Sequence, residues 1–421
     1  MTMCWKEPLL GAYVALVFTL DVGAAGGGGG PASEDVWLDP SHQEIAIIPV
    51  ETDTLTFSSA YFEPLYTNKG LAVFGSDLLR LLIRGEDYWR FKSFWVKLGY
   101  YCLGTYITSA FRTAYHEVGH GLRSRAYGYD YQLMFANDTD PMRKDENFFK
   151  FFVRDLLTLR RGACRSNALA SSPSQNKRVA IVAAGGMNNN AYFAEAMSDD
   201  LYRRQDVHFF EGVNYICGQL YAAAYAAGAG VLEDDPIHVE ANWRILGVPA
   251  AREDMQRASC ISFLLSATTY RTLFAIWNEL VHTGRQTGPF SIYGFRVPDI
   301  FSYTTSKGMS YKLVSEYKVR DGVHILFGCE HVGHGLPATE VNVGLEYDLG
   351  ESWRNLSCKG VLTFGQGLNV EAACTLPILE RLLATLGGAL YSRDSLLGER
   401  HAPDLRKKYS GTIYLSFSLK Y

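Results

Sequence analysis

A change in hydrophobic period near residue 289 is the feature that most constrains the fold. From Leu71 to about Leu280, apolar residues recur at the spacing of helices. From about Pro289 to Tyr421 they alternate with polar residues, which is typical of strands with two different faces. The clearest helical stretches are 91–127, 178–199, 213–232 and 255–280. The chain is therefore predicted to be an α+β protein, with a helical region followed by an antiparallel β region.

The β region is predicted to contain about eight strands, enough for a small closed barrel. Arg320-Asp321-Gly322 joins two of the strands and is typical of a hairpin turn. The final strand, Ile413–Tyr421, resembles the closing strand of bacterial outer-membrane β-barrels. A soluble sheet with one wet face would show the same alternation. The charged residues of the strands would face a lumen in the first case and bulk water in the second; they are Lys312, Glu316, Lys318, Glu330 and Glu371.

The N-terminus has the layout of a secretory signal peptide. Lys6 precedes an apolar run, Leu9–Leu20, which is followed by small residues, Val22–Ala25, and by a glycine tract. We expect residues 1–25 to be a signal peptide and the protein to be exported to the bacterial cell envelope, in the outer membrane or periplasm. An uncleaved anchor would place it in the inner membrane instead.

Length and charge narrow the possibilities further. A chain of 421 residues is long enough for two or three domains. We expect a linker with one or two strands at 26–70, a helical domain at 71–285 and a β domain at 286–421. The 40 Lys and Arg are balanced by 44 Asp and Glu, so the chain lacks the surplus of basic residues that is typical of nucleic-acid-binding proteins. Without Cys4 in the signal, seven cysteines remain, an odd number; we expect them to be mostly buried apolar residues, with one or two disulfides possible.

The motif that carries chemistry is His116-Glu117-Val118-Gly119-His120, an HExxH sequence inside a helical stretch. Residues four apart share one helix face, so both imidazoles can approach a single zinc ion. The intervening Glu117 is placed to act as general base and acid on a water molecule that zinc activates. The motif predicts a zinc peptidase; a helix with two exposed histidines is the alternative.

The residues around this motif resemble the site-2 protease family of zinc peptidases. His116–Gly121 resembles the family's first motif, and Gly128 is a suitable end for its helix. Ala184-Gly185-Gly186 resembles the start of the second motif, although Gly186 replaces the family's proline. The resemblance implies that Asn189 helps to hold the substrate or the oxyanion. A helix N-terminus with solvated amides is the alternative.

The resemblance also implies a third ligand, an aspartate after the next predicted helix. Asp234 and Asp235 stand at that place, without the glycine that follows the aspartate in the family. Asp235 precedes Pro236 and is expected to be extended and to cap a helix, which favours Asp234 as the ligand. Glu195, in a Glu195-x-x-x-Asp199 pattern, resembles the ligand of a second class of HExxH peptidases, the gluzincins.

These features predict a zinc-dependent endopeptidase of the cell envelope that acts on peptide or protein substrates and associates with a membrane. The helices are only moderately apolar, however, and none is an uninterrupted 18-residue span. The alternative is a non-enzymatic outer-membrane β-barrel protein, with the helices as a plug or scaffold and a structural metal site. A cleft that leads to Glu117 would favour the peptidase.

Overall fold

The computed structural model describes residues 54–58, 68–89, 93–129, 131–135, 148–158, 162–166, 173–203, 206–229, 234–281, 286–287, 291–348, 356–379 and 382–420. The predicted signal peptide, 1–25, lies outside these residues. Residues 51–421 form one compact unit, which contains both the helices and the main sheet.

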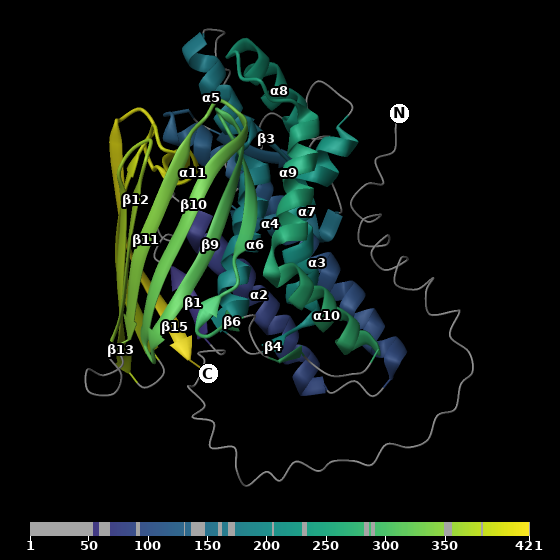
Figure 1. Cartoon of the computed structure of the whole chain (residues 1–421). Helices are drawn as coiled ribbons and strands as arrows, with labels where there is room; N and C mark the ends of the chain where they lie inside the picture. Colours follow the sequence, from purple (N-terminus) through teal and green to yellow (C-terminus); the bar gives the residue numbers. More distant parts are fainter. Residues whose placement is uncertain are drawn as a thin grey trace. The chain divides into compact units, whose positions relative to one another are not determined.

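The described residues form ten helices, of which α3 is the longest with 33 residues (Figure 1). It packs against α2, α4, α6 and α7, where aromatic side chains such as Phe111, Tyr115 and Phe193 are almost completely buried. The helices are α2 (Asn68–Trp89), α3 (Phe94–Ala126), α4 (Phe148–Thr158), α5 (Pro173–Ala183), α6 (Gly185–Arg203), α7 (Phe209–Gly228), α8 (Asp235–Ile245), α9 (Arg252–Leu265), α10 (Ala267–Val281) and α11 (Leu396–His401).

Most of the strands belong to one antiparallel sheet, in the order β1-β15-β14-β13-β12-β11-β10-β9-β7-β6, with β8 also paired to β9. They are β1 (Thr54–Ser58), β6 (Ser291–Ile292), β7 (Phe295–Arg296), β8 (Asp299–Thr305), β9 (Gly308–Arg320), β10 (Val323–Gly335), β11 (Thr339–Asp348), β12 (Ser357–Phe364), β13 (Asn369–Leu379), β14 (Leu382–Ser392) and β15 (Tyr409–Lys420). Two small sheets pair β2 (Tyr131–Phe135) with β3 (Gly162–Ser166), and β4 (Asp206–Val207) with β5 (Gln286–Thr287).

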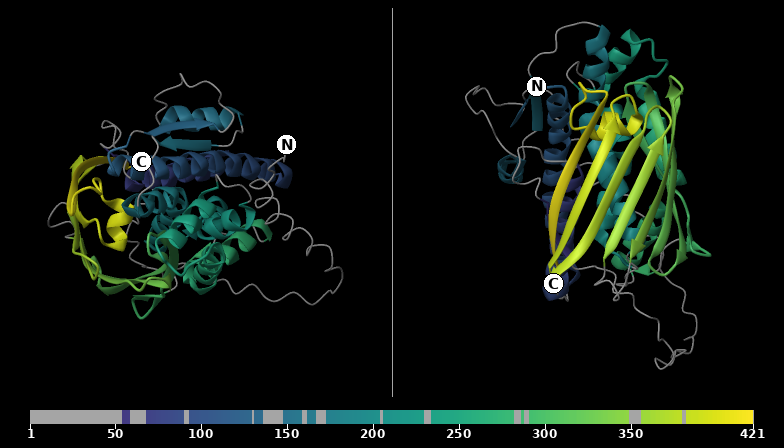
Figure 2. Two further views of the ribbon diagram at one scale, coloured as in Figure 1. Left: turned by 90° about the horizontal axis from the view of Figure 1, so that it is seen from above. Right: turned by 90° about the vertical axis from the view of Figure 1, so that its left-hand side faces the viewer.

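The predicted α+β order, helices followed by an antiparallel sheet, is confirmed, but closure into a barrel of about eight strands is wrong. Within the described residues the main sheet has 11 strands and is open, with β1 and β6 at its two ends. Helices occupy the gap: α2 contacts β1 at one edge, while α6 and α9 contact β8 at the other. Figure 2 shows the sheet as an arc around the helices. Because helices fill its concave side, the edges cannot meet.

Three of the five charged strand residues pair with helices; of the other two, Glu316 pairs with His324 of β10 and Lys318 pairs with Asp321 of the β9–β10 turn. Lys312 of β9 pairs with Glu195 of α6 at 2.5 Å, and Glu330 of β10 pairs with Arg400 of α11 at 2.5 Å. Glu371 of β13 pairs with Lys69 of α2. These three charges therefore face protein, in place of the lumen or bulk water that the sequence predicted, because each has a partner on a helix.

The length and composition of the helices were compared with what a membrane-spanning helix requires. Among the described residues, no single helix is long and apolar enough to cross a bilayer; α9 and α10, bent by 70° at Ser266, meet the length and composition test only as a pair.

Candidate metal centre

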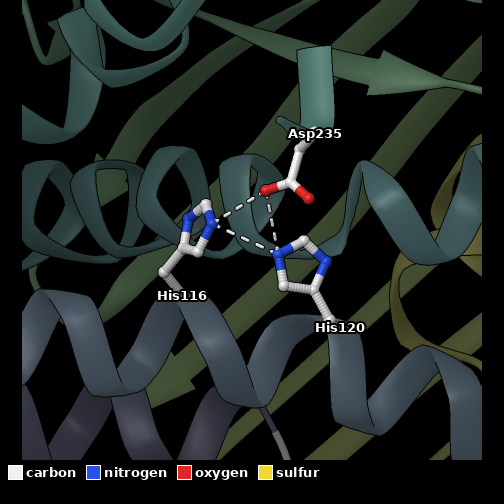
Figure 3. Close-up of side chains that lie close together, drawn as sticks. All are labelled: His116, His120 and Asp235. Carbon is white, nitrogen blue, oxygen red and sulfur yellow. Dashed lines mark hydrogen bonds and ion pairs between the residues drawn. The ribbon is translucent and has the colours of Figure 1, made fainter. Parts of the chain in front are cut away.

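The buried half of α3 carries the HExxH motif. His116 and His120 lie one turn apart on the same face, and their Nε2 atoms are 3.2 Å from each other (Figure 3). Their residues are 5% and 7% exposed, and Glu117 between them is 8% exposed. Unpaired charges are rarely buried to this degree, so the motif occupies a protected polar site.

The acidic partner of the two histidines is Asp235, the first residue of α8. Its Oδ2 lies 3.0 Å from His116 Nε2 and 3.1 Å from His120 Nε2. Asp234 is the N-cap of α8, although its side chain makes no capping hydrogen bond. The sequence predicted Asp234 as the ligand and Asp235 as the helix cap. In the structure Asp235 lies beside the histidines and Asp234 is the N-cap. The helix begins one residue earlier than Pro236 indicated, because the first turn of a helix tolerates a residue without an N–H.

The three atoms fit a metal ion. Zinc bonds of about 2.0–2.1 Å in a tetrahedron place neighbouring ligand atoms about 3.3 Å apart. The separations here are 3.0, 3.1 and 3.2 Å, so the two imidazoles and the carboxylate are close to the corners of such a tetrahedron. His116, His120 and Asp235 are therefore a possible metal-binding group.

A hydrogen bond to α5 orients His120. Its Nδ1 lies 2.7 Å from the carbonyl oxygen of Val182. Because a carbonyl only accepts, the ring proton sits on Nδ1 and the Nε2 lone pair points toward the other two ligand atoms. A backbone carbonyl behind a histidine is a common support in metal sites.

The corresponding contact of His116 is with Asn190 of α6, whose Nδ2 lies 3.3 Å from His116 Nδ1. The Oδ1 atom of Asn190 is buried and makes no hydrogen bond. As it stands, Nδ2 donates to both His116 Nδ1 and the Gly186 carbonyl; turning the amide over would lose both bonds and let Oδ1 accept a hydrogen bond from His116 Nδ1, which leaves His116 Nε2 free for a metal. Asn190 is thus the asparagine that contacts the metal group.

Asn189, which the sequence placed at the oxyanion, is fully buried between α6 and α3. Its Nδ2 donates to the carbonyl of Tyr115 at 2.8 Å, and its Oδ1 accepts from Arg123 at 3.0 Å. Both ends of the amide hold α3 against α6. Its role at the oxyanion stays a prediction.

Charge at the site is dominated by the carboxylates. Burial opposes a positive charge on His120, but Asp235 and Glu117 outweigh it and raise the pKa of His120 to about 9. Burial likewise opposes ionisation of Asp235, yet the two histidines hold its pKa well below the usual range. Burial, Glu117 and Asp235 also raise the pKa of the Cys164 thiol in β3. The site therefore favours a cation, whether a shared proton or a metal.

Two tyrosines of α7 complete the surroundings, and the sequence analysis missed them. The rings of Tyr221 and Tyr225 lie 5.2 Å and 5.6 Å from the ring of His116, centroid to centroid. Burial and the nearby carboxylates of Asp235 and Glu117 raise the pKa of the Tyr225 hydroxyl. Their spacing of four residues on a predicted helix was the available signal, but it did not show which face of the helix would meet His116.

Glu195, the rival third ligand, is engaged elsewhere. Its carboxylate accepts from the Tyr303 hydroxyl and pairs with Lys312, both at 2.5 Å. Asp199 of the same pattern pairs with Arg296 at 2.6 Å. Both residues therefore connect α6 to the β7–β9 end of the sheet.

A second group of ligand types, Glu86, His208 and Glu279, joins α2, α7 and α10. The Phe210 N–H donates to His208 Nδ1, so the ring proton sits on Nε2 and points at Glu86, 2.7 Å away. Lys97 lies 3.0 Å from the other oxygen of Glu86. Protons and an ammonium group already satisfy this cluster, which suits a structural junction better than a metal site.

Comparisons of the chain with protein-family models, with curated proteins and with solved structures found no significant match.

Proposed function

We propose that this protein is a zinc-dependent peptidase of the bacterial cell envelope, similar in its site to the site-2 proteases. The observation that carries the proposal is the convergence of His116, His120 and Asp235 within 3.2 Å, with Glu117 between the histidines in sequence. A carboxylate more than 100 residues away in the chain has no local reason to join an HExxH pair.

Each residue has a distinct role in this proposal. His116, His120 and Asp235 would hold zinc, which supplies a Lewis acid that polarises a peptide carbonyl and acidifies water. Glu117 accepts a proton from the attacking water and passes it to the leaving amine. Val182 keeps the His120 ring in the required tautomer, and the Asn190 amide faces the outer nitrogen of His116.

Metal analysis and a peptide-cleavage assay on the same preparations test the proposal. We expect about one zinc per purified wild-type chain and measurable cleavage of casein or a fluorogenic peptide. Glu117→Gln should retain zinc and lose cleavage by about 100-fold or more, because it removes the base and leaves the ligands. His120→Ala should lose both. His331→Ala, which removes an exposed histidine of β10, is the control and should change neither.

A structural metal site in a non-enzymatic envelope protein is the second candidate. The burial of His116, Glu117 and His120 favours it, because a catalytic base must reach its substrate. Under this candidate, Glu117→Gln and wild type would both retain zinc, and neither would cleave. Zinc retention with unchanged cleavage in Glu117→Gln would refute the peptidase mechanism.

A further inference from the structure

The main sheet has the reverse of the polarity expected for a sheet in water. On its convex side, the pairing of β10 to β14 brings apolar side chains into one row across five strands: Phe327, Val343, Leu362, Val370 and Leu390. Neighbouring positions on this side are also apolar and exposed, including Leu345 at 52%, Leu386 at 60% and Ile413 at 84%. We name the convex side of β10–β15 the convex band.

The charged residues of these strands all lie on the opposite side. Pairing places Glu330 opposite Glu340, and Glu346 opposite Lys359, in positions that alternate with the convex band. Glu371 pairs with Lys69 inside the arc. Among the described residues of β10–β15, the convex side therefore carries no Asp, Glu, Lys or Arg. A sheet that faces water would place its charges outside.

Charged turns border the convex band at both ends. The β9–β10 turn carries Arg320 and the highly exposed Asp321, and the segment before β15 carries Arg406 and Lys407. Along β11, the uncharged side runs from Thr339 to Tyr347. Nine residues at about 3.3 Å each span about 30 Å, or roughly 23 Å at the tilt usual for membrane strands. This height is close to that of a bilayer's hydrocarbon layer, about 25–30 Å.

The size and curvature of the convex band distinguish between two possible partners, a second protein surface and the acyl chains of lipids. Six strands about 4.8 Å apart and about 30 Å long make a face of roughly 850 Å², more than the few hundred Å² usual for the largest apolar patch of a monomer. The face is convex, as the view from above in Figure 2 shows. A rigid second sheet could touch such an arc only along a strip, whereas acyl chains can follow it.

We infer that the convex band lies against the hydrocarbon interior of a lipid bilayer. The inference concerns a surface remote from the metal group and does not depend on peptidase activity. It assigns the sheet a second role besides enclosing the helices, which is to hold the protein in the membrane.

Bromine-labelled lipids test this inference directly. The full chain is purified in detergent and reconstituted into phosphatidylcholine vesicles whose acyl chains carry bromine near the bilayer centre, which quenches tryptophan at close range. Leu386→Trp adds a fluorophore to the convex band, and Lys407→Trp adds one at the charged border as the control. We expect the added emission of Leu386→Trp to fall at least about twofold and that of Lys407→Trp to change little.

Partitioning into vesicles supplies a second measurement. Leu386→Lys places a charge in the convex band, whereas Ile245→Lys makes the same kind of change at an exposed apolar site on α8. We expect Leu386→Lys to reduce partitioning about tenfold or more, and Ile245→Lys and His120→Ala to leave it near wild type. Equal quenching of the two tryptophans, equal partitioning of the two lysine variants, or a soluble dimer that protects position 386 would each overturn the inference.

Discussion

Gly119 of α3 and Gly185 of α6 touch each other through their backbones. A Cβ on Gly119 would lie 2.4 Å from the carbonyl oxygen of Gly185, and a Cβ on Gly185 would lie 2.5 Å from that of Gly119. A Cβ on the next residue, Gly186, would lie 2.4 Å from the ring of His116. The glycines of the two sequence motifs thus allow the two helices to approach at the level of the metal group, and Gly186 leaves room for a ligand ring.

Gly119→Ala should weaken zinc binding, because its methyl group forces α3 and α6 apart. We expect a loss of about 1–3 kcal/mol in the free energy of unfolding and of about tenfold or more in zinc affinity. Denaturant unfolding and competition with a zinc-sensitive dye measure the two effects. Gly99→Ala, on the same helix with no atom within 4 Å of the added Cβ, is the control and should stabilise the protein by up to about 1 kcal/mol. Equal behaviour of the two variants would contradict the packing argument.

Asp235→Asn should lower zinc affinity by at least about tenfold, because it removes the anionic ligand between the two histidines. Its neighbour supplies a matched control. Asp234→Asn makes the same chemical change one residue earlier, at the N-cap, and should leave zinc affinity within about threefold of wild type. Zinc titration of both variants by calorimetry decides the matter, and a stronger effect at Asp234 would mean that the ligand has been misassigned.

The junction at Glu86 should make stability depend on pH. Burial opposes the charge of Glu86, but bonds from His208 and Lys97 outweigh it and lower its pKa to about 2, from an ordinary 4.5. A lowered pKa in the folded state means that Glu86 stabilises the fold above about pH 4.5, and that this contribution is lost as pH falls toward 2. Glu86→Gln should therefore cost about 2 kcal/mol near pH 6 and progressively less at lower pH.

Thermal melts of wild type and Glu86→Gln at a series of pH values measure this difference. Glu253→Gln, at an exposed site in the first turn of α9, is the control and should show a small difference at every pH. A Glu86→Gln difference that stays constant from pH 6 to about pH 3 would show that the charge of Glu86 is not the cause.

Cys358 and Cys374, which lie on the convex band, should form a disulfide when the full chain is oxidised in detergent solution, before it is placed in vesicles. They are direct partners across β12 and β13. Directly opposite residues of an antiparallel pair have the Cα separation that a disulfide needs. Oxidised glutathione would accept the two electrons and the two thiol protons and become two molecules of glutathione.

Peptide mass spectrometry should then detect a Cys358–Cys374 cross-link, and the loop of about 15 residues that it closes should raise stability by about 3 kcal/mol. Cys374→Ser should abolish both effects. Cys260→Ser, at an exposed cysteine of α9, should abolish neither. A cross-link from Cys358 to another cysteine would refute the strand register.

Periodic patterns in the sequence were sufficient to predict those features of the fold that depend only on residues close together in the chain. Four-residue spacing placed His116 and His120 on one face of a helix, and two-residue alternation identified strands such as β11 and β15, because side-chain direction repeats every 3.6 or two residues whatever lies nearby. The helical spacing of apolar residues around the HExxH motif also predicted that the motif lies inside a helix, and it lies in α3.

Contacts between distant segments decided the rest. Choosing Asp235 over Asp234 required the start of α8 and its position beside α3, and the sheet stayed open because helices fill its concave side. Alternation likewise separated the charged from the apolar face of each strand but did not show which one lay inside. That depended on Lys69, Glu195 and Arg400, which bring partner charges from three helices. The sequence by itself determined the two histidines and the two-faced strands, because these are properties of local backbone geometry; only the tertiary structure decided the third ligand and the buried face, because both depend on which remote side chains share one volume.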